Sequence, residues 1–473
     1  MSGTTLSANA PVAGGSVRPF RPGIVLGTLL TCQLMIVLDM TVMNVALPRI
    51  QSDLGFSSAT LSWVMNAYTL VFGGLLLLGG RAGDLFGRRR LLIAGTALFT
   101  LASLAGGLAE SSGWLLVARI LQGLGSAMVG PSTLALLSTT FTEPKARLRA
   151  LAWFSGMSSA GFSAGLVFGG LLTEWLSWRS VLFINVPFGI AVVAFGTRYL
   201  REPERRPARL DLPGALTATT GVAAVVYGFI RAAANGWGDP TTLVSLLVGA
   251  ALVATFLVIE TRTDQPLMPL RLFADRNRAT AYVNFFLGPM AGMSMFFFMT
   301  QYLQEIRGMS ALGTGFAFLP MALLVFGASR FIPRLLPRFG PKPVALTGTA
   351  LMIAGVALLT QLSTGTGYFP MIFVPMLLMG LGMGLAFAPL NVIIMGTVPP
   401  ADAGAAGGVL QTMQQIGATL GLAILVTVFG SATRTATGSP HEILVAGMTE
   451  AFVAAAIIAS LTFVVALTFR KAR

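Results

Sequence analysis

Charged residues are scarce in this sequence. Asp, Glu, Lys and Arg make up 10% of the 473 residues, whereas 55% are hydrophobic and the mean hydropathy is +0.79. Soluble globular domains carry about 25% charged residues. So small a charged fraction excludes a soluble domain as the main body of the chain, and it predicts that lipid is the principal solvent.

Residues that carry enzymatic chemistry are equally rare. Cys32 is the single cysteine, which excludes an intramolecular disulfide and a cysteine-based metal site. The single histidine, His441, falls in a predicted loop, and the sequence contains no Gly-x-x-x-x-Gly-Lys-Ser/Thr phosphate loop for ATP. A membrane enzyme, such as a lipid-modifying transferase, would need paired intramembrane acids or a metal cluster for catalysis, and the sequence shows neither. We therefore expect no enzymatic activity, no metal and no cofactor.

Long apolar runs, by contrast, are abundant. A helix needs roughly 20 residues to cross a hydrocarbon core of about 30 Å. Fourteen runs qualify: 23–47, 60–80, 91–109, 114–138, 150–173, 180–199, 213–231, 241–260, 280–303, 312–332, 344–361, 369–393, 405–430 and 448–468. Open strands in lipid would leave backbone groups unpaired, so we predict an all-α integral membrane protein with about 14 transmembrane helices.

Basic residues are distributed unevenly between the two predicted sides of the membrane. With both termini inside, cytoplasmic segments hold 25 of the 31 Lys and Arg residues, outer segments hold five, and Arg119 lies within a run. This positive-inside bias predicts that both termini are cytoplasmic. Arg outnumbers Lys by 28 to 3 and Ala and Gly abound, as in GC-rich bacterial genes, so we expect a bacterial inner-membrane protein. The net charge of +14 is not gathered on one face as nucleic-acid binding requires, so we expect no nucleic-acid partner.

The spacing of the runs predicts two halves. Residues 201–279 form a linker with two apolar runs, an inserted hairpin, between six-helix halves at 23–200 and 280–468. Short cytoplasmic tails are predicted at 1–22 and 469–473. Phe86 to Arg89 (FGRR) and Phe339 to Lys342 (FGPK) occupy matching places in the two halves, which indicates the internal duplication common in transporters.

A glycine-rich basic segment follows the second run. It reads GRAGDLFGRRR from Gly80 to Arg90 and resembles the cytoplasmic-loop signature of the major facilitator superfamily. We expect its glycines to let the chain turn closely beneath the bilayer and its charges to latch the halves during switching. The alternative is that the arginines only anchor topology. The expected switch residues are Gly80, Asp84, Gly87, Arg88 and Arg89.

Further segments resemble the 14-helix drug:proton antiporters of that superfamily. They are LDMTVMNVALP from Leu38 to Pro48, LVARILQGLGSA from Leu116 to Ala127, WRSVLFINVPFG from Trp178 to Gly189, and GGVLQTMQQIG from Gly407 to Gly417. The resemblance covers nearly the whole chain. It implies a major facilitator fold without a cofactor, in which two pseudo-symmetric six-helix halves rock about a central site.

Asp39 and Arg119 are the predicted proton-coupling residues. A lone arginine within a membrane span costs at least about 2.5 to 3.5 kcal/mol, so a partnership with Asp39 on another helix would offset both charges. Alternating access would change the hydration of Asp39 and its distance from Arg119. Both changes would alter the proton affinity of Asp39, which is the physical basis of a proton switch. The alternative is a static ion pair that only orients helices.

Small and polar residues complete the predicted site. The fifth run resembles the antiporter motif through Gly161, Gly165, Gly169 and Gly170, although Ala152 and Leu166 replace its usual glycine and proline. Polar residues within apolar runs are the substrate-cavity candidates, because lipid-facing positions tolerate them poorly. These candidates are Gln33, Asn66, Gln122, Asn284, Gln301, Asn391, Gln411 and Gln414.

The function that these features predict is secondary active transport. We expect proton-coupled efflux of a small amphipathic compound or antibiotic by alternating access, with a monomer sufficient for function. Uptake or symport on the same fold stays open, because the fifth run lacks the usual proline. A membrane enzyme is the remote alternative. The expected partners are protons, a small molecule and the lipid bilayer.

Overall fold

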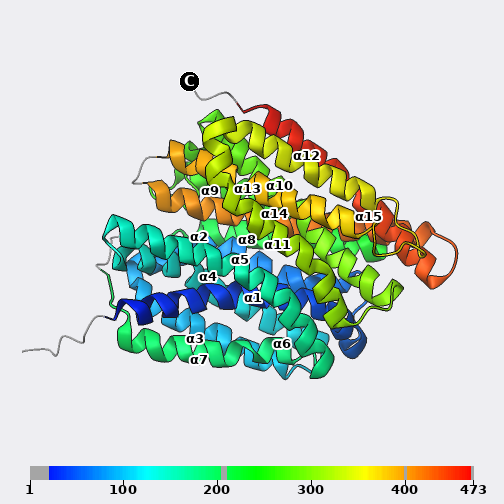
Figure 1. Ribbon diagram of the computed structural model, residues 1–473, viewed down its shortest axis with the longest axis horizontal. Coiled ribbons are helices and arrows are strands. Elements are labelled where there is room, and N and C mark those ends of the chain that lie inside the picture. Colours follow the sequence, from blue (N-terminus) through cyan, green and yellow to red (C-terminus); the bar gives the residue numbers. More distant parts are fainter. Residues whose placement is uncertain (1–20, 204–209, 399–401, 470–473) are drawn as a thin grey trace, which may run out of the picture.

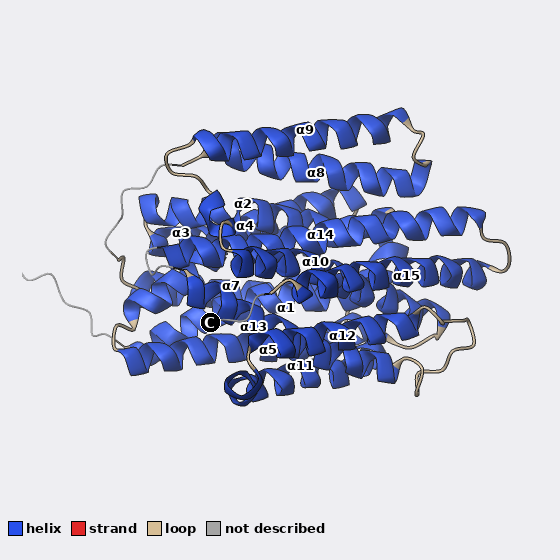
Figure 2. Cartoon of the chain, turned by 90° about the horizontal axis from the view of Figure 1, so that it is seen from above, coloured by secondary structure: helices blue, strands red, loops and turns tan. Residues whose placement is uncertain are grey.

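The computed structural model describes residues 21–203, 210–398 and 402–469, and within these residues every regular element is a helix (Figure 2). Most of the two predicted tails and the middle of the first linker segment lie outside the described residues. Fourteen described segments are long and apolar enough to cross a membrane, which confirms the predicted number.

The elements follow one another with short connections. In chain order they are α1 (Pro22–Leu54), α2 (Trp63–Phe86), α3 (Arg88–Gly107), α4 (Ser112–Thr140), α5 (Pro144–Trp175), α6 (Ser180–Phe183), α7 (Asn185–Tyr199), α8 (Leu212–Asn235), α9 (Pro240–Arg262), α10 (Arg276–Gln301), α11 (Ala311–Phe339), α12 (Pro341–Leu359), α13 (Phe373–Thr397), α14 (Ala403–Thr435) and α15 (Pro440–Leu467). The short α6 and α7 together make one span, and a π-helical turn at Tyr302–Ile306 extends α10.

Most helices run beyond the apolar runs that the sequence marked. The first predicted run ended at residue 47, but α1 continues through Pro48 to Leu54 and ends at Gly55, whose φ of 68° is left-handed. A proline removes only one helical hydrogen bond, and a helix outside the hydrocarbon layer still satisfies its own backbone. Apolar length therefore predicts the part of each helix in lipid and misses the polar turns at its ends.

Two groups of helices form the body of the molecule (Figure 1). Helices α1 to α7 make one group and α10 to α15 the other, and they meet where α5 packs on α11 and α2 packs on α14. We call the end where α1 begins and α15 ends the terminal end, and the opposite one the far end. This arrangement agrees with the two predicted six-helix halves.

The hairpin α8–α9 is central in the sequence but peripheral in space. Helix α8 packs on α2 and α14, one from each half, and α9 lies outside α8 (Figure 2). At the hairpin turn Asp239 accepts a hydrogen bond from Arg231 Nε at 2.8 Å and another from the Thr242 backbone N–H at 2.9 Å. The insertion therefore covers the contact between α2 and α14 from one side.

Buried apolar side chains form different cores at the two ends. At the far end one core includes Val42 and Leu166 of the first half together with Phe296 and Phe318 of the second. At the terminal end the buried members separate, with one core confined to residues 25–200 and another to residues 268–469. The halves are therefore joined by a common core at the far end.

Candidate functional site

Two opposite charges lie against each other in the middle of the first half. Asp39 on α1 and Arg119 on α4 form an ion pair with 2.6 Å between Asp39 Oδ2 and Arg119 Nη1, and both side chains are fully buried. Separate burial of either charge would cost several kcal/mol, which mutual attraction and further hydrogen bonds offset. The structure thus brings together the two residues predicted for proton coupling.

Neighbouring polar groups complete this cluster. Asp39 Oδ1 accepts hydrogen bonds from Gln122 Nε2 at 3.0 Å and from Asn185 Nδ2 at 2.8 Å. The guanidinium of Arg119 also donates to the Val64 carbonyl and to Gln122 Oε1, both at 3.0 Å. Oriented amide and carbonyl groups therefore surround both side chains in a site closed to solvent.

Aromatic and hydroxyl groups border the cluster. The guanidinium carbon of Arg119 lies 4.4 Å from the ring centre of Tyr68, a cation–π contact that also supports the buried charge. The Tyr68 hydroxyl lies 2.8 Å from Ser126 Oγ. Gln122 Nε2 donates to Ser103 Oγ at 2.7 Å, which anchors that amide to α3.

The sequence-based search missed Asn185 as a site residue. It is fully buried, begins α7 one residue after Ile184 caps the short α6, and its side-chain nitrogen donates to Asp39 at 2.8 Å. The signal was present, since Asn185 is a polar residue within an apolar run, the same criterion that selected Asn66. Its nearness to Asp39 depends on how α7 approaches α1, which the sequence does not encode locally.

The basic segment after α2 departs from the predicted loop. Gly80 and Gly83 lie within α2, and Gly87 alone, with φ at 107°, separates α2 from α3. The expectation of a glycine-rich turn was therefore wrong for Gly80 and Gly83, because the helix continues to Phe86. One glycine in a positive-φ conformation is enough to reverse the chain.

Charges around Gly87 bind elements of the first half. Arg88 Nη2 lies 2.5 Å from Asp84 Oδ1, and the guanidinium of Arg89 donates to the carbonyls of Gly196 and Thr197 on α7. In the described part of the chain these bonds stay within one half. The predicted latching role of this segment between the halves remains a prediction.

The first turn of α3 has a carboxylate partner that was not predicted. Glu202 accepts hydrogen bonds from the backbone N–H groups of Arg89 at 3.1 Å and Arg90 at 3.3 Å. A carboxylate at this position satisfies unpaired N–H groups and interacts favourably with the helix dipole. Arg81 reaches the linker beyond the hairpin, where its Nη2 donates to the Pro266 carbonyl at 3.3 Å.

The glycines of α5 lie at two helix contacts. A Cβ atom on Gly165 would lie 1.8 Å from Thr41 Oγ1, and one on Gly169 would lie 2.8 Å from the Cα of Val42. Gly161 also faces α1, with a Cβ 3.0 Å from Leu34 Cδ1. Gly170 instead faces the other half, where its Cβ would lie 2.6 Å from the Leu312 Cα of α11. These small residues allow close helix approach.

The predicted cavity residues do not form one group. Gln122 joins the Asp39 cluster, and Gln33 donates to Ser158 Oγ at 2.9 Å. Asn66 is buried with neither polar side-chain atom hydrogen-bonded. Asn66 is thus the candidate whose polar groups most lack a partner.

The remaining candidates lie in the second half. Asn284 and Gln301 are buried and donate to carbonyls of their own helix, those of Thr280 and Phe297. Asn391 and Gln411 are exposed, and Gln414 is half-buried. The structure brings none of these five candidates into contact with Asp39 through a described hydrogen bond.

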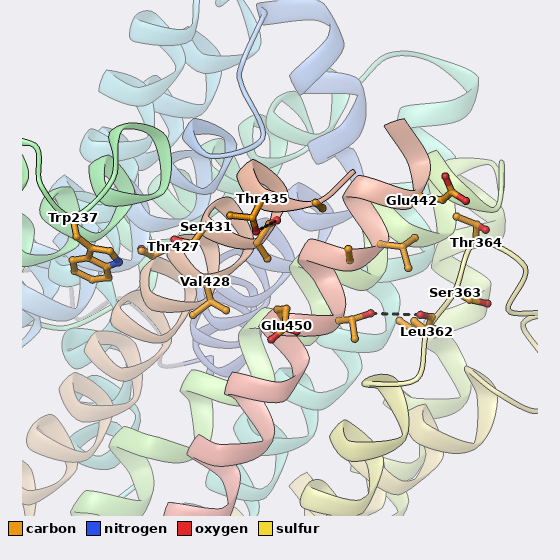
Figure 3. A pocket seen from close by; sticks show the side chains of 15 residues that line it. Trp237, Leu362, Ser363, Thr364, Thr427, Val428, Ser431, Thr435, Glu442 and Glu450 are labelled. Carbon is orange, nitrogen blue, oxygen red and sulfur yellow. Dashed lines mark hydrogen bonds between the residues drawn. The ribbon is translucent and has the colours of Figure 1, made fainter. Parts of the chain in front are cut away.

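A cavity of about 960 Å³ lies elsewhere, at the far end of the second half (Figure 3). It is lined by α14 and α15, by the connection after α12 and by Trp237 of the hairpin. Glu442 and Glu450 are its two acidic residues. None of the predicted cavity residues lines it, and its walls come from the ends of helices and from connections.

Comparison with known proteins identifies the family. The Major Facilitator Superfamily model matches residues 29–422. The chain belongs to the major facilitator superfamily. It is therefore a multi-pass membrane transporter, a class that is distinct from enzymes.

Relatives of known name extend over most of the chain. The puromycin resistance protein of Streptomyces alboniger is 42% identical and the alignment covers 86% of this chain and 81% of that protein. The cephamycin export protein of Amycolatopsis lactamdurans is 40% identical over 90% of this chain and 88% of that one. A solved peptide transporter of the POT family has a TM-score of 0.68 at 17% identity, covering 95% of this chain and 97% of that one, which supports the fold.

Proposed function

We propose that this transporter exports a small amphipathic compound in exchange for protons and that Asp39 is the group that binds the proton. The observation that carries the proposal is the fully buried Asp39–Arg119 pair with its shell of amide donors. An ionisable pair enclosed in a membrane protein is by default a candidate for ion or proton coupling. Two relatives named for resistance or export support the substrate class and the direction.

Protonation of Asp39 would change the net charge of this cluster. The ionised pair has no net charge, whereas a neutral Asp39 leaves the Arg119 cation without its counter-charge in a buried site. A buried cation without its partner is unfavourable, so the protonated cluster favours a conformation that hydrates or re-pairs Arg119. We infer that this preference drives the rocking of one half against the other.

The distribution of basic residues supports one orientation in the membrane. We place the terminal end in the cytoplasm, because the excess of Lys and Arg gathers there, including Arg88 to Arg90. In this orientation the common core joins the two halves at the outer side of the membrane, and the two separate cores lie at the cytoplasmic side. A substrate would enter from the cytoplasmic side in this state.

Transport in proteoliposomes tests the proposal. An imposed proton gradient should drive a fluorescent amphipathic dye against its concentration gradient, and a protonophore should stop this movement. Asp39→Asn should abolish it while the protein still inserts and elutes as a folded species. The matched control is Asp53→Asn, since Asp53 is an acid on the same helix that binds Trp178 and Arg179 outside the cluster.

Two outcomes would overturn parts of this proposal. Undiminished gradient-driven transport by Asp39→Asn would eliminate Asp39 as the coupling group. Dye movement in the same direction as protons would instead replace antiport with symport, the alternative that the same fold allows.

A further inference from the structure

The carboxylate of Asp39 is surrounded by donors alone. Oδ2 faces Arg119 Nη1 at 2.6 Å, and Oδ1 faces the amide nitrogens of Gln122 at 3.0 Å and Asn185 at 2.8 Å. An ionised carboxylate is purely an acceptor, so this shell fits the charged form. A proton on Oδ1 would face two NH₂ groups and would need an acceptor in their place.

Gln122 is fixed and is unable to supply that acceptor. Its Nε2 also donates to Ser103 Oγ at 2.7 Å, and its Oε1 accepts from Arg119 Nη1 at 3.0 Å. The Ser103 hydroxyl could donate to the amide after a half-turn, but the rotated amide would set its N–H groups against the guanidinium of Arg119. Gln122 therefore remains a donor to Asp39 in either protonation state.

Asn185 differs from Gln122 in that its side-chain oxygen is not hydrogen-bonded. Its Oδ1 is buried and makes no hydrogen bond, so the one described bond of its side chain is that from Nδ2 to Asp39. A buried carbonyl without a partner is energetically unfavourable and calls for an explanation. A half-turn of the Asn185 amide would place this unused oxygen where the nitrogen now lies, and it would sacrifice no other hydrogen bond.

We propose that Asn185 is the proton-dependent partner of Asp39: its amide donates to the ionised carboxylate and rotates to accept a hydrogen bond from the carboxylic acid. One proton is added to Asp39 Oδ1. The hydrogen bond from Asn185 Nδ2–H to Asp39 Oδ1 is replaced by a hydrogen bond from the Asp39 O–H to Asn185 Oδ1, and no covalent bond of either side chain is broken. Asn185 acts as a positioning residue for the proton. This inference rests on the proposed function of Asp39.

Infrared difference spectroscopy of the purified full-length protein tests this inference. Titration from high to low pH should produce a carboxylic acid C=O band of Asp39 and, at the same time, lower the wavenumber of an asparagine side-chain carbonyl that gains a hydrogen bond. In Asn185→Leu the asparagine band should vanish and the Asp39 band should move to higher wavenumber. Asn185→Ser, whose hydroxyl both donates and accepts, should move the Asp39 band less.

The matched control is Asn44→Leu. Asn44 is also a buried asparagine of the first half whose Oδ1 has no partner, but no described hydrogen bond links it to Asp39. Its variant should leave the Asp39 band in place. An Asp39 band that Asn185→Leu and Asn185→Ser leave unmoved would overturn this inference alone.

A different result would contradict the proposed function as well as this inference. If wild type and Asp39→Asn gave the same carboxylic acid bands, Asp39 would take up no proton, and both the proposed function and the role of Asn185 would fail. The pH profile of dye efflux provides a second readout, because a merely structural Asn185 would change the rate at all pH values equally. We expect the profile of Asn185→Leu to shift along the pH axis and that of Asn185→Ser to stay closer to wild type.

Discussion

Gly165 of α5 lies directly against Thr41 of α1, two residues after Asp39. A Cβ atom on Gly165 would lie 1.8 Å from Thr41 Oγ1 and 2.9 Å from Thr41 Cβ. Rotation of the Thr41 side chain would relieve the contact with Oγ1 but not the one with Cβ, so a side chain at position 165 strains the packing of α5 on α1. The packing of α5 thereby sets the position of the helix that carries the proposed proton site.

Gly165→Ala should therefore impair transport. We expect a loss of at least about tenfold in gradient-driven dye efflux, which corresponds to about 1.4 kcal/mol, because separating α1 from α5 displaces Asp39. Thr41→Gly in the same chain should restore part of the activity, since it removes the atoms that clash. Gly156→Ala is the matched control, because nothing lies within 4 Å of its added Cβ. Equal efflux by Gly165→Ala and Gly156→Ala would contradict the packing argument.

Arg119 and Asp39 should depend on each other for stability. Arg119→Leu leaves the Asp39 charge unpaired in a buried site, and breaking such a pair costs about 3 to 5 kcal/mol. Adding Asp39→Asn removes the orphaned charge, so the double variant should unfold at a higher temperature than Arg119→Leu alone. Thermal unfolding in detergent measures the order of the Tm values. Strictly additive losses would show that the two side chains do not interact.

The sequence allowed the number of spans and the main pair of the site to be predicted. Fourteen apolar runs correspond to fourteen helical spans because apolar length is what lipid requires. Asp39 and Arg119 could be paired in advance because each is an intramembrane charge that needs a counter-charge nearby. These features depend on composition along the chain and on one strong energetic rule.

Other features depend on how distant segments approach in space. Asn185 joins Asp39 because α7 packs against α1, and the outer place of α9 follows from the packing of α8 on α2 and α14. The turn at Gly87 was placed too early because glycines are tolerated within membrane helices, so Gly80 and Gly83 did not end α2. No local pattern encodes these arrangements.

The hairpin turn between α8 and α9 should be insensitive to mild acid. Its carboxylate, Asp239, has a pKa lowered from the ordinary value, mainly by the hydrogen bond from Arg231 and also by the Thr242 backbone N–H. A lowered folded-state pKa contributes stability that is present above the unfolded value and is lost only as the pH falls through the folded one. Hydrogen exchange at the start of α9 should thus show constant protection between pH 7 and about 5, apart from the intrinsic pH dependence of exchange.

Asp239→Asn provides the comparison for that measurement. It should weaken protection of the first turn of α9 at pH 7, because it removes the charge that Arg231 contacts, while leaving α15 unaffected. Loss of protection in wild type on going from pH 7 to 5 would contradict the lowered pKa.

Glu174 should help to hold the far end closed. Its carboxylate on the last turn of α5 accepts a hydrogen bond at 2.9 Å from the Leu312 backbone N–H at the start of α11, so it joins the two halves beside Gly170. Because the pair is exposed, we expect Glu174→Gln to weaken closure by about 0.5 to 1 kcal/mol, roughly two- to fivefold in the ratio of closed to open molecules.

Distance measurements between spin labels on the two halves at the far end would detect this shift. Cys32 is the only cysteine, so Cys32→Ala gives a background in which label sites can be introduced freely. Glu143→Gln is the matched control, since Glu143 is an exposed acid at the opposite end of α5 and makes no side-chain cap there. A distance distribution that Glu174→Gln leaves unchanged would mean that closure depends on the glycine contacts and the common apolar core alone.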